Sequence, residues 1–393
     1  MLIGSGRYPT IVLVSNPTHA HALAYFTGGH GRIGFVRLSG NGLLADTCCT
    51  TVVSFKGNSN VLDDALVTTA SSRQTGIDLL CHCSGNRIVR DRIYGNKLGL
   101  IFGPYNSPRQ VNTVDASHIH GNACDGVTFQ GANAPTNKGG FGAVVNSTLD
   151  ANGGRCPNGI PAAGVYSLGD LSGGRISGNH IYDNCGNDVD LVSGAGFTIT
   201  RNMIDDPGHQ FSGATLTCAG AGANLLNVQS SKIVDNTVTN DDNAHNAVPT
   251  SGDPNHIYEA SGAALYSDLP NHGQVAIAFV LAYSLSESGT TTGNHISDNV
   301  FQANCSGSCI GLGYFASRDT GYDASLGWSA ETTNYYTGNN PNGSNIGSVR
   351  GGGNWYAADT SCTEASSPPP CNTDDSQHPT SVNWARNDGF FFY

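Results

Sequence analysis

The sequence predicts an all-β solenoid, in which short coils of strands and tight turns stack on one another. A repeat is the first observation: Ile176, Asn179, Ile181 and Asn184 alternate apolar and turn-forming residues, and the same rhythm returns in residues 199–204. A unit this short cannot bury its own apolar face, so it must stack on a neighbour. Composition is the second observation, because 52 Gly and a charged fraction of 12% indicate many tight turns and few helices.

One elongated domain is expected, since a solenoid of 393 residues grows by adding coils. Residues 1–57, with strand-like stretches at 11–14 and 32–38, are predicted to form N-terminal coils or their cap. Residues 58–316 form the predicted core. Residues 317–393, rich in Gly, Asn and aromatic residues, are predicted to be an irregular C-terminal cap over the last unpaired edge. Sugar stacking or an oligomer contact is the alternative role for these aromatic residues, and the oligomeric state stays open.

Laying the coils on one another predicts two columns of turn residues. The first contains Asp91, Ser117, Asn146, Asn179, Asn202, Asn236 and Asn299, and the second contains Asn96, Asn122, Asn152, Asn184, Asn240 and Asn304. Stacked Asn side chains hydrogen-bond along the stack and tolerate left-handed backbone. The pattern resembles the right-handed parallel β-helix of the pectate-lyase-like superfamily across residues 58–316. That fold carries lyases, hydrolases, epimerases, tailspikes and adhesins, so it does not fix the function.

Twelve cysteines in a loop-rich chain favour disulfides and a secreted, extracellular or periplasmic location. Neighbouring cysteine pairs lack the spacing of a zinc finger or ribbon. The expected local bridges join Cys305 to Cys309 and Cys362 to Cys371. The chain opens without a signal peptide and has no apolar run of membrane-spanning length, so we expect an exported precursor to carry the signal.

The net charge of −12, with only 18 Lys and Arg, opposes a nucleic-acid partner. It also disfavours direct binding of a strongly anionic polymer unless metal ions intervene. Two insertions, residues 153–163 and 241–261, leave the same corner of the coil and bracket an acidic region. Long loops over a rigid scaffold are where sites usually lie.

Between these insertions, Asp188 and Asp190 are predicted to point outward together, because Val189 and Leu191 point inward. Residues two apart on one face lie about 6.6 Å apart at the backbone, which overlaps the carboxyl separation of an inverting glycosidase. The first hypothesis is therefore a glycoside hydrolase or transglycosylase that cleaves a polysaccharide and needs no cofactor. Asp188 and Asp190 would supply acid and base.

Further candidate residues lie in the same region of the repeat. Asp205, Asp206 and His209 are predicted to assist catalysis, and the predicted substrate-binding residues are Tyr166, Arg201, His180, Thr215 and Glu259. In this register Tyr166 and Thr215 flank Asp190 in one outward column. That column, with its mixed polarity, is compatible with neutral or weakly acidic glycans.

A polysaccharide lyase is the second hypothesis. Asp183 and Asp206 are predicted to stack about 4.8 Å apart in neighbouring coils, where they could hold Ca²⁺. The ion would neutralise a uronate carboxylate while Arg201 or His209 takes the proton α to it. A non-catalytic adhesin or glycan-binding module is the third hypothesis.

Two closer resemblances concern the acidic segments. NDVD at 187–190 and DDPGH at 205–209 are similar in acid inventory to the polygalacturonases, although the chain has no RIK and its His follows the acidic pair more closely. The segment CGNDVDLVSGAGFTITRN resembles a stretch of the inulin fructotransferases, which implies that Asp190 matches a carboxylate of that family.

Overall fold

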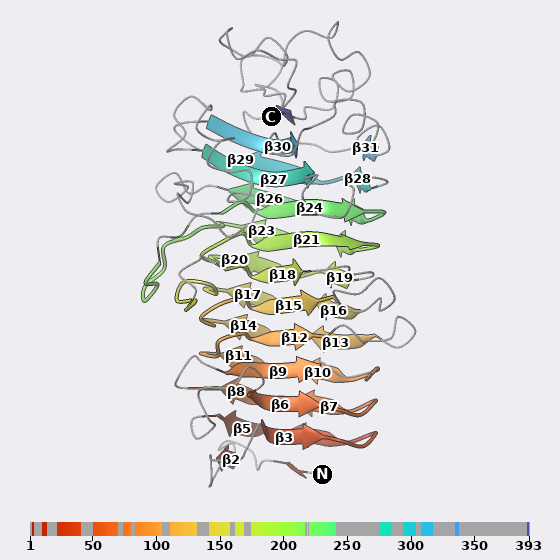
Figure 1. Cartoon of the computed structure of the whole chain (residues 1–393), viewed down its shortest axis with the longest axis vertical. Helices are drawn as coiled ribbons and strands as arrows, with labels where there is room; N and C mark the ends of the chain where they lie inside the picture. Colours follow the sequence, from red (N-terminus) through yellow and green to blue (C-terminus); the bar gives the residue numbers. More distant parts are fainter. Residues whose placement is uncertain are drawn as a thin grey trace, which may run out of the picture.

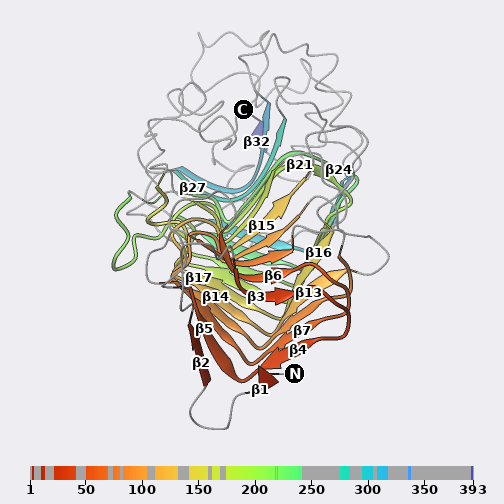
Figure 2. The same ribbon diagram turned by 60° about the horizontal axis from the view of Figure 1, so that its bottom comes forward.

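The structure, a computed structural model, is an all-β parallel β-helix, as predicted. It describes residues 2–3, 10–13, 22–40, 50–69, 74–79, 83–103, 111–131, 141–157, 162–168, 174–216, 218, 220–240, 275–283, 294–303, 308–316, 335–337 and 391–392. Successive coils stack along the long axis from the N-terminus to the C-terminus (Figure 1). Each coil contributes one strand in turn to each of three parallel sheets, here named A, B and C (Figure 2).

Sheet A has 11 strands in the described part of the chain. They are β1 (Leu2–Ile3), β4 (Arg32–Gly34), β7 (Val61–Asp63), β10 (Arg87–Val89), β13 (Asn112–Asp115), β16 (Gly142–Val145), β19 (Gly174–Ser177), β22 (Thr198–Thr200), β25 (Lys232–Val234), β28 (His295–Ser297) and β31 (Tyr335–Thr337).

Within the described ranges, sheet B has 10 strands. They are β2 (Thr10–Leu13), β5 (Val36–Ser39), β8 (Leu66–Thr68), β11 (Arg92–Tyr94), β14 (His118–His120), β17 (Thr148–Asp150), β20 (His180–Tyr182), β23 (Met203–Asp205), β26 (Thr237–Asn240) and β29 (Val300–Ala303).

The described residues of sheet C form 11 strands. They are β3 (Ala22–Phe26), β6 (Thr51–Phe55), β9 (Thr75–Leu79), β12 (Leu100–Phe102), β15 (Val127–Gln130), β18 (Val165–Leu168), β21 (Val189–Ala195), β24 (Ala223–Gln229), β27 (Val275–Tyr283), β30 (Ser308–Ala316) and β32 (Phe391–Phe392).

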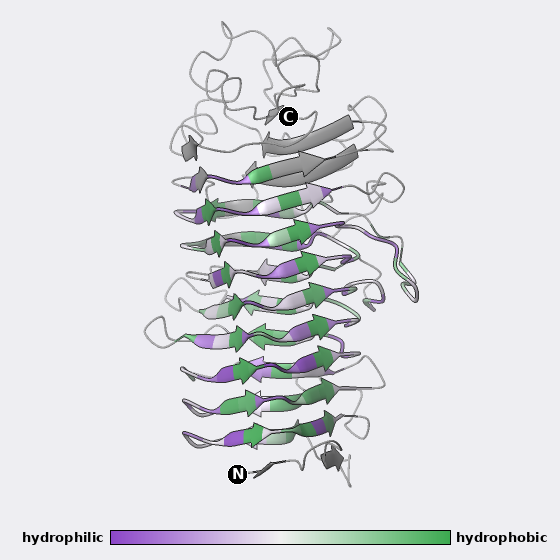
Figure 3. Ribbon diagram, turned by 180° about the vertical axis from the view of Figure 1, so that it is seen from behind, coloured by the Kyte–Doolittle hydropathy of each residue, from purple (hydrophilic) through white to green (hydrophobic). Residues whose placement is uncertain are grey.

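Apolar side chains fill the interior because residues alternate between the two faces of each strand. In sheet B the central residue of each short strand points inward, and Ile93, Ile119, Leu149, Ile181 and Ile204 are fully or almost fully buried. Hydrophobic segments recur at the same place in successive coils (Figure 3). The residues on either side of each central position therefore point outward.

The A–B corner carries the first predicted column, with one correction. Asn179, Asn202 and Asn236 each accept a hydrogen bond from the backbone of the preceding coil, for example Asn179 N to Asn202 Oδ1 at 3.0 Å. Ser147, and not the predicted Asn146, occupies the ladder, because Ser117 N donates to Ser147 Oγ. Asn146 lies one residue earlier, where its φ is 49°. Asn tolerates that left-handed conformation, so the residue type alone did not fix the register.

The B–C corner carries the second column from Asn96 to Asn184. Asn96, Asn122 and Asn152 each donate a backbone N–H to the next ladder side chain at 3.1 Å. The column stops at Asn184, because the corresponding residue of the next coil is Pro207, which offers no side-chain acceptor. Asn240 is buried and bonds to Gly220 O instead, and the predicted member Asn304 lies outside the described residues.

A third ladder at the C–A corner was not predicted. Asn60, Asn86 and Asn112 bond in the same way. Phe rings fill the corner beside Gly142 and Gly174, and the ladder resumes where Ser231 N donates to Asn294 Oδ1. A Cβ at Gly142 would lie 2.5 Å from the ring of Phe102, so the ring fills this corner only because the facing residue is Gly.

Where both cysteines are described, two disulfides join neighbouring coils: Cys124–Cys156 and Cys185–Cys218. The first ties part of the predicted 153–163 insertion to the coil below. The expected bridges Cys305–Cys309 and Cys362–Cys371, the 241–261 insertion and most of the predicted cap fall outside the described residues and side chains. Within the described part of the chain, no helix has the length and hydropathy needed to cross a membrane.

Candidate functional site on the outer face of sheet B

Asp188 does not point outward with Asp190, which corrects the predicted acid pair. The Asp188 side chain is 0% exposed, and Asn184 Nδ2 donates to its Oδ1 at 2.7 Å. Asn184 belongs to the buried B–C ladder, so this carboxyl group faces the interior. Burial raises the pKa of Asp188 well above its usual value, because a charged carboxylate is poorly solvated there.

A column of glycines explains this inward direction. The residues that match Asp188 in the preceding coils are Gly76, Gly99, Gly126 and Gly164. A Cβ at Gly164 would lie 2.7 Å from Asn184 Nδ2, so side chains at this position point at the ladder. Because the ladder ends at Asn184, room remains in this coil for the Asp188 carboxyl group. The simple alternation of strand residues fails here since Asp188 lies at the corner and precedes β21.

Asp190 does lie in the outward register of sheet C, but it is 0% exposed. Tyr166 and Asn224 are its neighbours on the adjacent strands, and Asn224 Nδ2 donates to Asp190 Oδ1 at 2.9 Å. Asn224 therefore takes the place that was predicted for Thr215. Thr215 is exposed in a loop, where its backbone N–H donates to Gly154 O.

The outer face of sheet B presents an accessible set of reactive side chains. Two outward columns flank the buried central residues of five consecutive strands, β11, β14, β17, β20 and β23. We call this set the sheet B strip; its members are Arg92, Tyr94, His118, His120, Thr148, Asp150, His180, Tyr182, Met203 and Asp205. Each member is half-buried or exposed, so solvent and a ligand can reach the strip.

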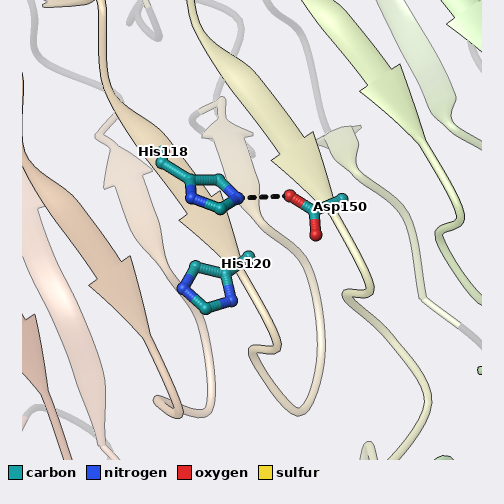
Figure 4. A group of neighbouring side chains, drawn as sticks. All are labelled: His118, His120 and Asp150. Carbon is teal, nitrogen blue, oxygen red and sulfur yellow. Dashed lines mark hydrogen bonds and ion pairs between the residues drawn. The ribbon is translucent and has the colours of Figure 1, made fainter. Parts of the chain in front are cut away.

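Five side chains in the N-terminal half of the strip contact one another. His118 Nε2 lies 2.5 Å from Asp150 Oδ1, and the rings of His118 and His120 stack with centroids 4.2 Å apart (Figure 4). Arg92 Nε donates to His120 Nε2 at 2.9 Å, and its guanidinium lies 5.3 Å from the centre of the Tyr94 ring. Burial, with smaller effects of His118 and Arg92, lowers the pKa of His120 to about 4. His120 is therefore neutral near pH 7 and accepts the Arg92 hydrogen bond.

The C-terminal half contains a second histidine and carboxylate pair. His180 Nε2 lies 3.0 Å from Asp205 Oδ1, and the His180 ring stacks on Tyr182 at 4.2 Å. Burial, together with nearby carboxylates such as Asp150, raises the pKa of Tyr182. Tyr182 therefore keeps its proton and can donate it. An imidazole oriented by a carboxylate, beside a phenol, is a common arrangement for proton transfer.

Asp183 and Asp206 lie in neighbouring coils, as predicted from the register, because they follow the paired residues Tyr182 and Asp205. Both have left-handed backbone, with φ of 55° and 50°. His209 Nδ1 lies 3.8 Å from Asp183 Oδ1, and burial raises the pKa of Asp183 in spite of that neighbour. Both acids occupy a left-handed corner position that Gly121 occupies in an earlier coil.

The remaining predicted residues are scattered. Arg201 is exposed at the A–B corner, also with left-handed backbone, and Glu259 lies outside the described residues. Among the described residues, the group of three His, Cys, Asp or Glu side chains able to hold a metal ion is His118, His120 and Asp150. Sequence reasoning missed this group. The signal was present, since stacking the coils places His120 and Asp150 in one outward column and His118 in the adjoining one.

Comparison with solved structures supports the fold, whereas the sequence comparisons find no match. No protein-family model matches the chain, and no curated protein sequence matches it. Among solved structures, the Azotobacter vinelandii mannuronan C-5 epimerase AlgE6 A-module is similar, with a TM-score of 0.56 and 14% identity over 86% of this chain and 76% of that chain. The AlgE4 A-module of the same organism gives a TM-score of 0.51 and 14% identity over 87% and 83%. At this identity the likeness establishes the parallel β-helix alone.

Proposed function

We propose that this protein is a secreted, polysaccharide-modifying enzyme that binds its substrate along the sheet B strip and acts on uronic-acid residues by proton transfer. The observation that carries the proposal is the strip itself: histidine, tyrosine, arginine and aspartate side chains lie in contact on one accessible face. The two similar structures are epimerases of mannuronan, and the disulfides are compatible with an oxidising, extracellular setting.

The chemistry assigns a role to each half of the strip. His180, oriented by Asp205, takes the proton from the carbon α to the uronate carboxylate. The neighbouring carboxylate makes this C–H bond more acidic. The electron pair left on carbon then expels the glycosidic oxygen at the β position, and Tyr182 gives that oxygen its proton. If the carbon instead regains a proton, delivered by water to its opposite face, the sugar is epimerised and the glycosidic bond stays intact. Arg92, an exposed cation, binds the carboxylate of a neighbouring residue in the polymer.

Hydrolysis is the competing reaction, and one observation supports it. Asp150 and Asp205 lie in the same outward column, two strands apart, so their backbones are about 9.6 Å from each other. That value lies near the upper end of the carboxyl separation in inverting glycosidases. Each of these carboxylates already contacts a histidine, which favours the proton-transfer proposal.

The test is a panel of polymannuronate, polygalacturonate and a neutral glycan, assayed in D₂O with the full chain. An absorbance rise near about 235 nm, from an unsaturated uronate, would support elimination. Deuterium at the α carbon without chain cleavage would support epimerisation. New reducing ends without that absorbance would replace the proposal by hydrolysis, and silence on all substrates with retained binding would favour the non-catalytic glycan-binding module.

A further inference from the structure

The N-terminal half of the strip has the composition of a metal site. One ligand atom each from His118, His120 and Asp150 can be chosen so that all lie within 4.8 Å of one another (Figure 4). We propose that these three side chains bind a divalent transition metal ion such as Zn²⁺ or Co²⁺. The metal site is independent of the reaction that the enzyme catalyses, while its role in catalysis, given below, rests on the proposed function.

The fold holds the three ligands on rigid backbone. His118 and His120 flank the buried Ile119 on β14, so both rings stand on the same outer face. Asp150 on β17 is the direct partner of His120 in the parallel register, and the buried Leu149 anchors that strand. Neither strand needs to move for the three side chains to converge.

Side-chain rotation is enough to bring the ligand atoms to bonding distance. Metal bonds to His nitrogen and Asp oxygen are about 2.0–2.2 Å long, so atoms that share one ion lie about 3–3.5 Å apart. His118 Nε2 and Asp150 Oδ1 are closer than this and must separate slightly, with the ion replacing the proton between them. Both side chains are partly exposed, which permits the adjustment and leaves an open position for water or a substrate oxygen.

The donor set selects the kind of metal. Two imidazoles and one carboxylate suit Zn²⁺, Co²⁺, Ni²⁺ or Fe²⁺, whereas Ca²⁺ and Mg²⁺ prefer oxygen ligands. The site therefore differs from the predicted Ca²⁺ site at Asp183 and Asp206. His120 also accepts the Arg92 hydrogen bond, so the guanidinium competes with an ion for Nε2 and repels its charge. Arg92 is exposed and can swing away.

Within the proposed function, the ion would neutralise the uronate carboxylate next to His180. Thr148 of the strip pairs with both His118 and His180 on the neighbouring strands, so the two halves of the strip are continuous. The chain has a net charge of −12 and would repel an anionic polymer. A bound cation would reduce this repulsion at the site.

The test uses the full chain, stripped with chelator and titrated with Zn²⁺ by calorimetry and with Co²⁺ by visible absorption. We expect one ion per chain with a cobalt spectrum of low coordination number. His118→Gln, His120→Gln and Asp150→Asn should each weaken binding by about tenfold or more, while His295→Gln, an exposed histidine on sheet A, should not. Arg92→Gln should tighten binding. Circular dichroism melting confirms that each variant is folded.

Equal binding by the wild type and the His118→Gln and His120→Gln variants, or no binding by the wild type, would overturn the metal site. Looser binding by Arg92→Gln would show that the ion does not approach His120 Nε2 and would contradict the geometry. Turnover that survives chelation together with absent metal binding would refute this inference alone. Metal binding without turnover on any polymer would refute the proposed function and leave the site standing.

Discussion

In the coils from β11 to β24, the outer faces of sheets B and C have the same register but opposite accessibility. On sheet C, Asp190 and Tyr166 are 0% and 9% exposed, and the outward residues of the preceding coils, such as Thr128 and Ile101, are also buried. On sheet B, the corresponding outward residues are half-buried or exposed, and Met203 reaches 50%. An outward register is therefore necessary for a site but does not make one. The acid-rich segment around Asp190 has the outward register but is buried. The sheet B strip has the outward register and is accessible to solvent.

The largest expected effect separates the two faces by activity. His180→Gln on sheet B should lower kcat by about 10²–10⁴-fold, because it removes the general base. Asp190→Asn on sheet C should keep most of the turnover, since that carboxyl group is buried and bonded to Asn224. Steady-state kinetics on the best substrate of the panel measures both. The reverse order of effects would return the site to sheet C.

A ladder substitution tests whether the corner supports the strip. Asn202 N and Nδ2 both donate to Asn236 Oδ1, and Asn202 Oδ1 accepts from the backbone of Asn179. Asn202→Ala leaves buried polar groups without partners, and the free energy of unfolding should fall by about 2–4 kcal/mol. Urea denaturation measures the loss. Ser230→Ala, at an exposed turn position, is the control and should change stability by less than about 0.5 kcal/mol.

The third prediction concerns the effect of pH on Asp188, the buried residue that precedes β21. Burial raises the pKa of Asp188, so the folded state keeps a proton that the unfolded chain releases near its ordinary value of about 3.9. Stability is then lost as pH rises above that ordinary value. Asp188→Asn cannot titrate and should be more stable than the wild type near pH 7 by about 1–3 kcal/mol, because it avoids both burial of a charge and uptake of a proton at this position.

The measurement is the difference in melting temperature between the wild type and Asp188→Asn, taken from pH 4 to 8 in steps of about one unit. Because other titrating groups are the same in both proteins, this difference reports the contribution of Asp188. The gap should widen with pH. A gap that narrows would mean that the Asp188 carboxylate is stabilised as an anion, contrary to its surroundings.

The smallest effect compares two exposed apolar side chains. Met203 lies in the sheet B strip, and Tyr25 lies on the outer face of sheet C, with 50% and 49% exposure. Substituting either by Ala should change stability by less than about 0.5 kcal/mol. Met203→Ala should raise KM a few-fold because it borders the substrate path, whereas Tyr25→Ala should not. Equal KM changes would argue that the substrate does not follow sheet B.

The sequence by itself determined the solenoid and much of its register. Alternation of apolar residues and the recurrent Asn turns predicted the coils, the Asn179–Asn202–Asn236 ladder and the stacking of Asp183 on Asp206, because these patterns are local and repeat along the chain. The third ladder could have been found in the same way, since Asn60, Asn86 and Asn112 recur at one spacing.

Only the tertiary structure decided which outward residues are accessible and which side chains meet. Asp188 turned inward because it stands in a glycine column at a corner, and His118 met Asp150 because parallel pairing joins residues from successive coils. Both outcomes depend on coil-to-coil contacts and on how the backbone bends between strands. Composition and spacing within one segment do not contain that information, so the sequence identified the acids around Asp190 but not that Asp188 and Asp190 are buried.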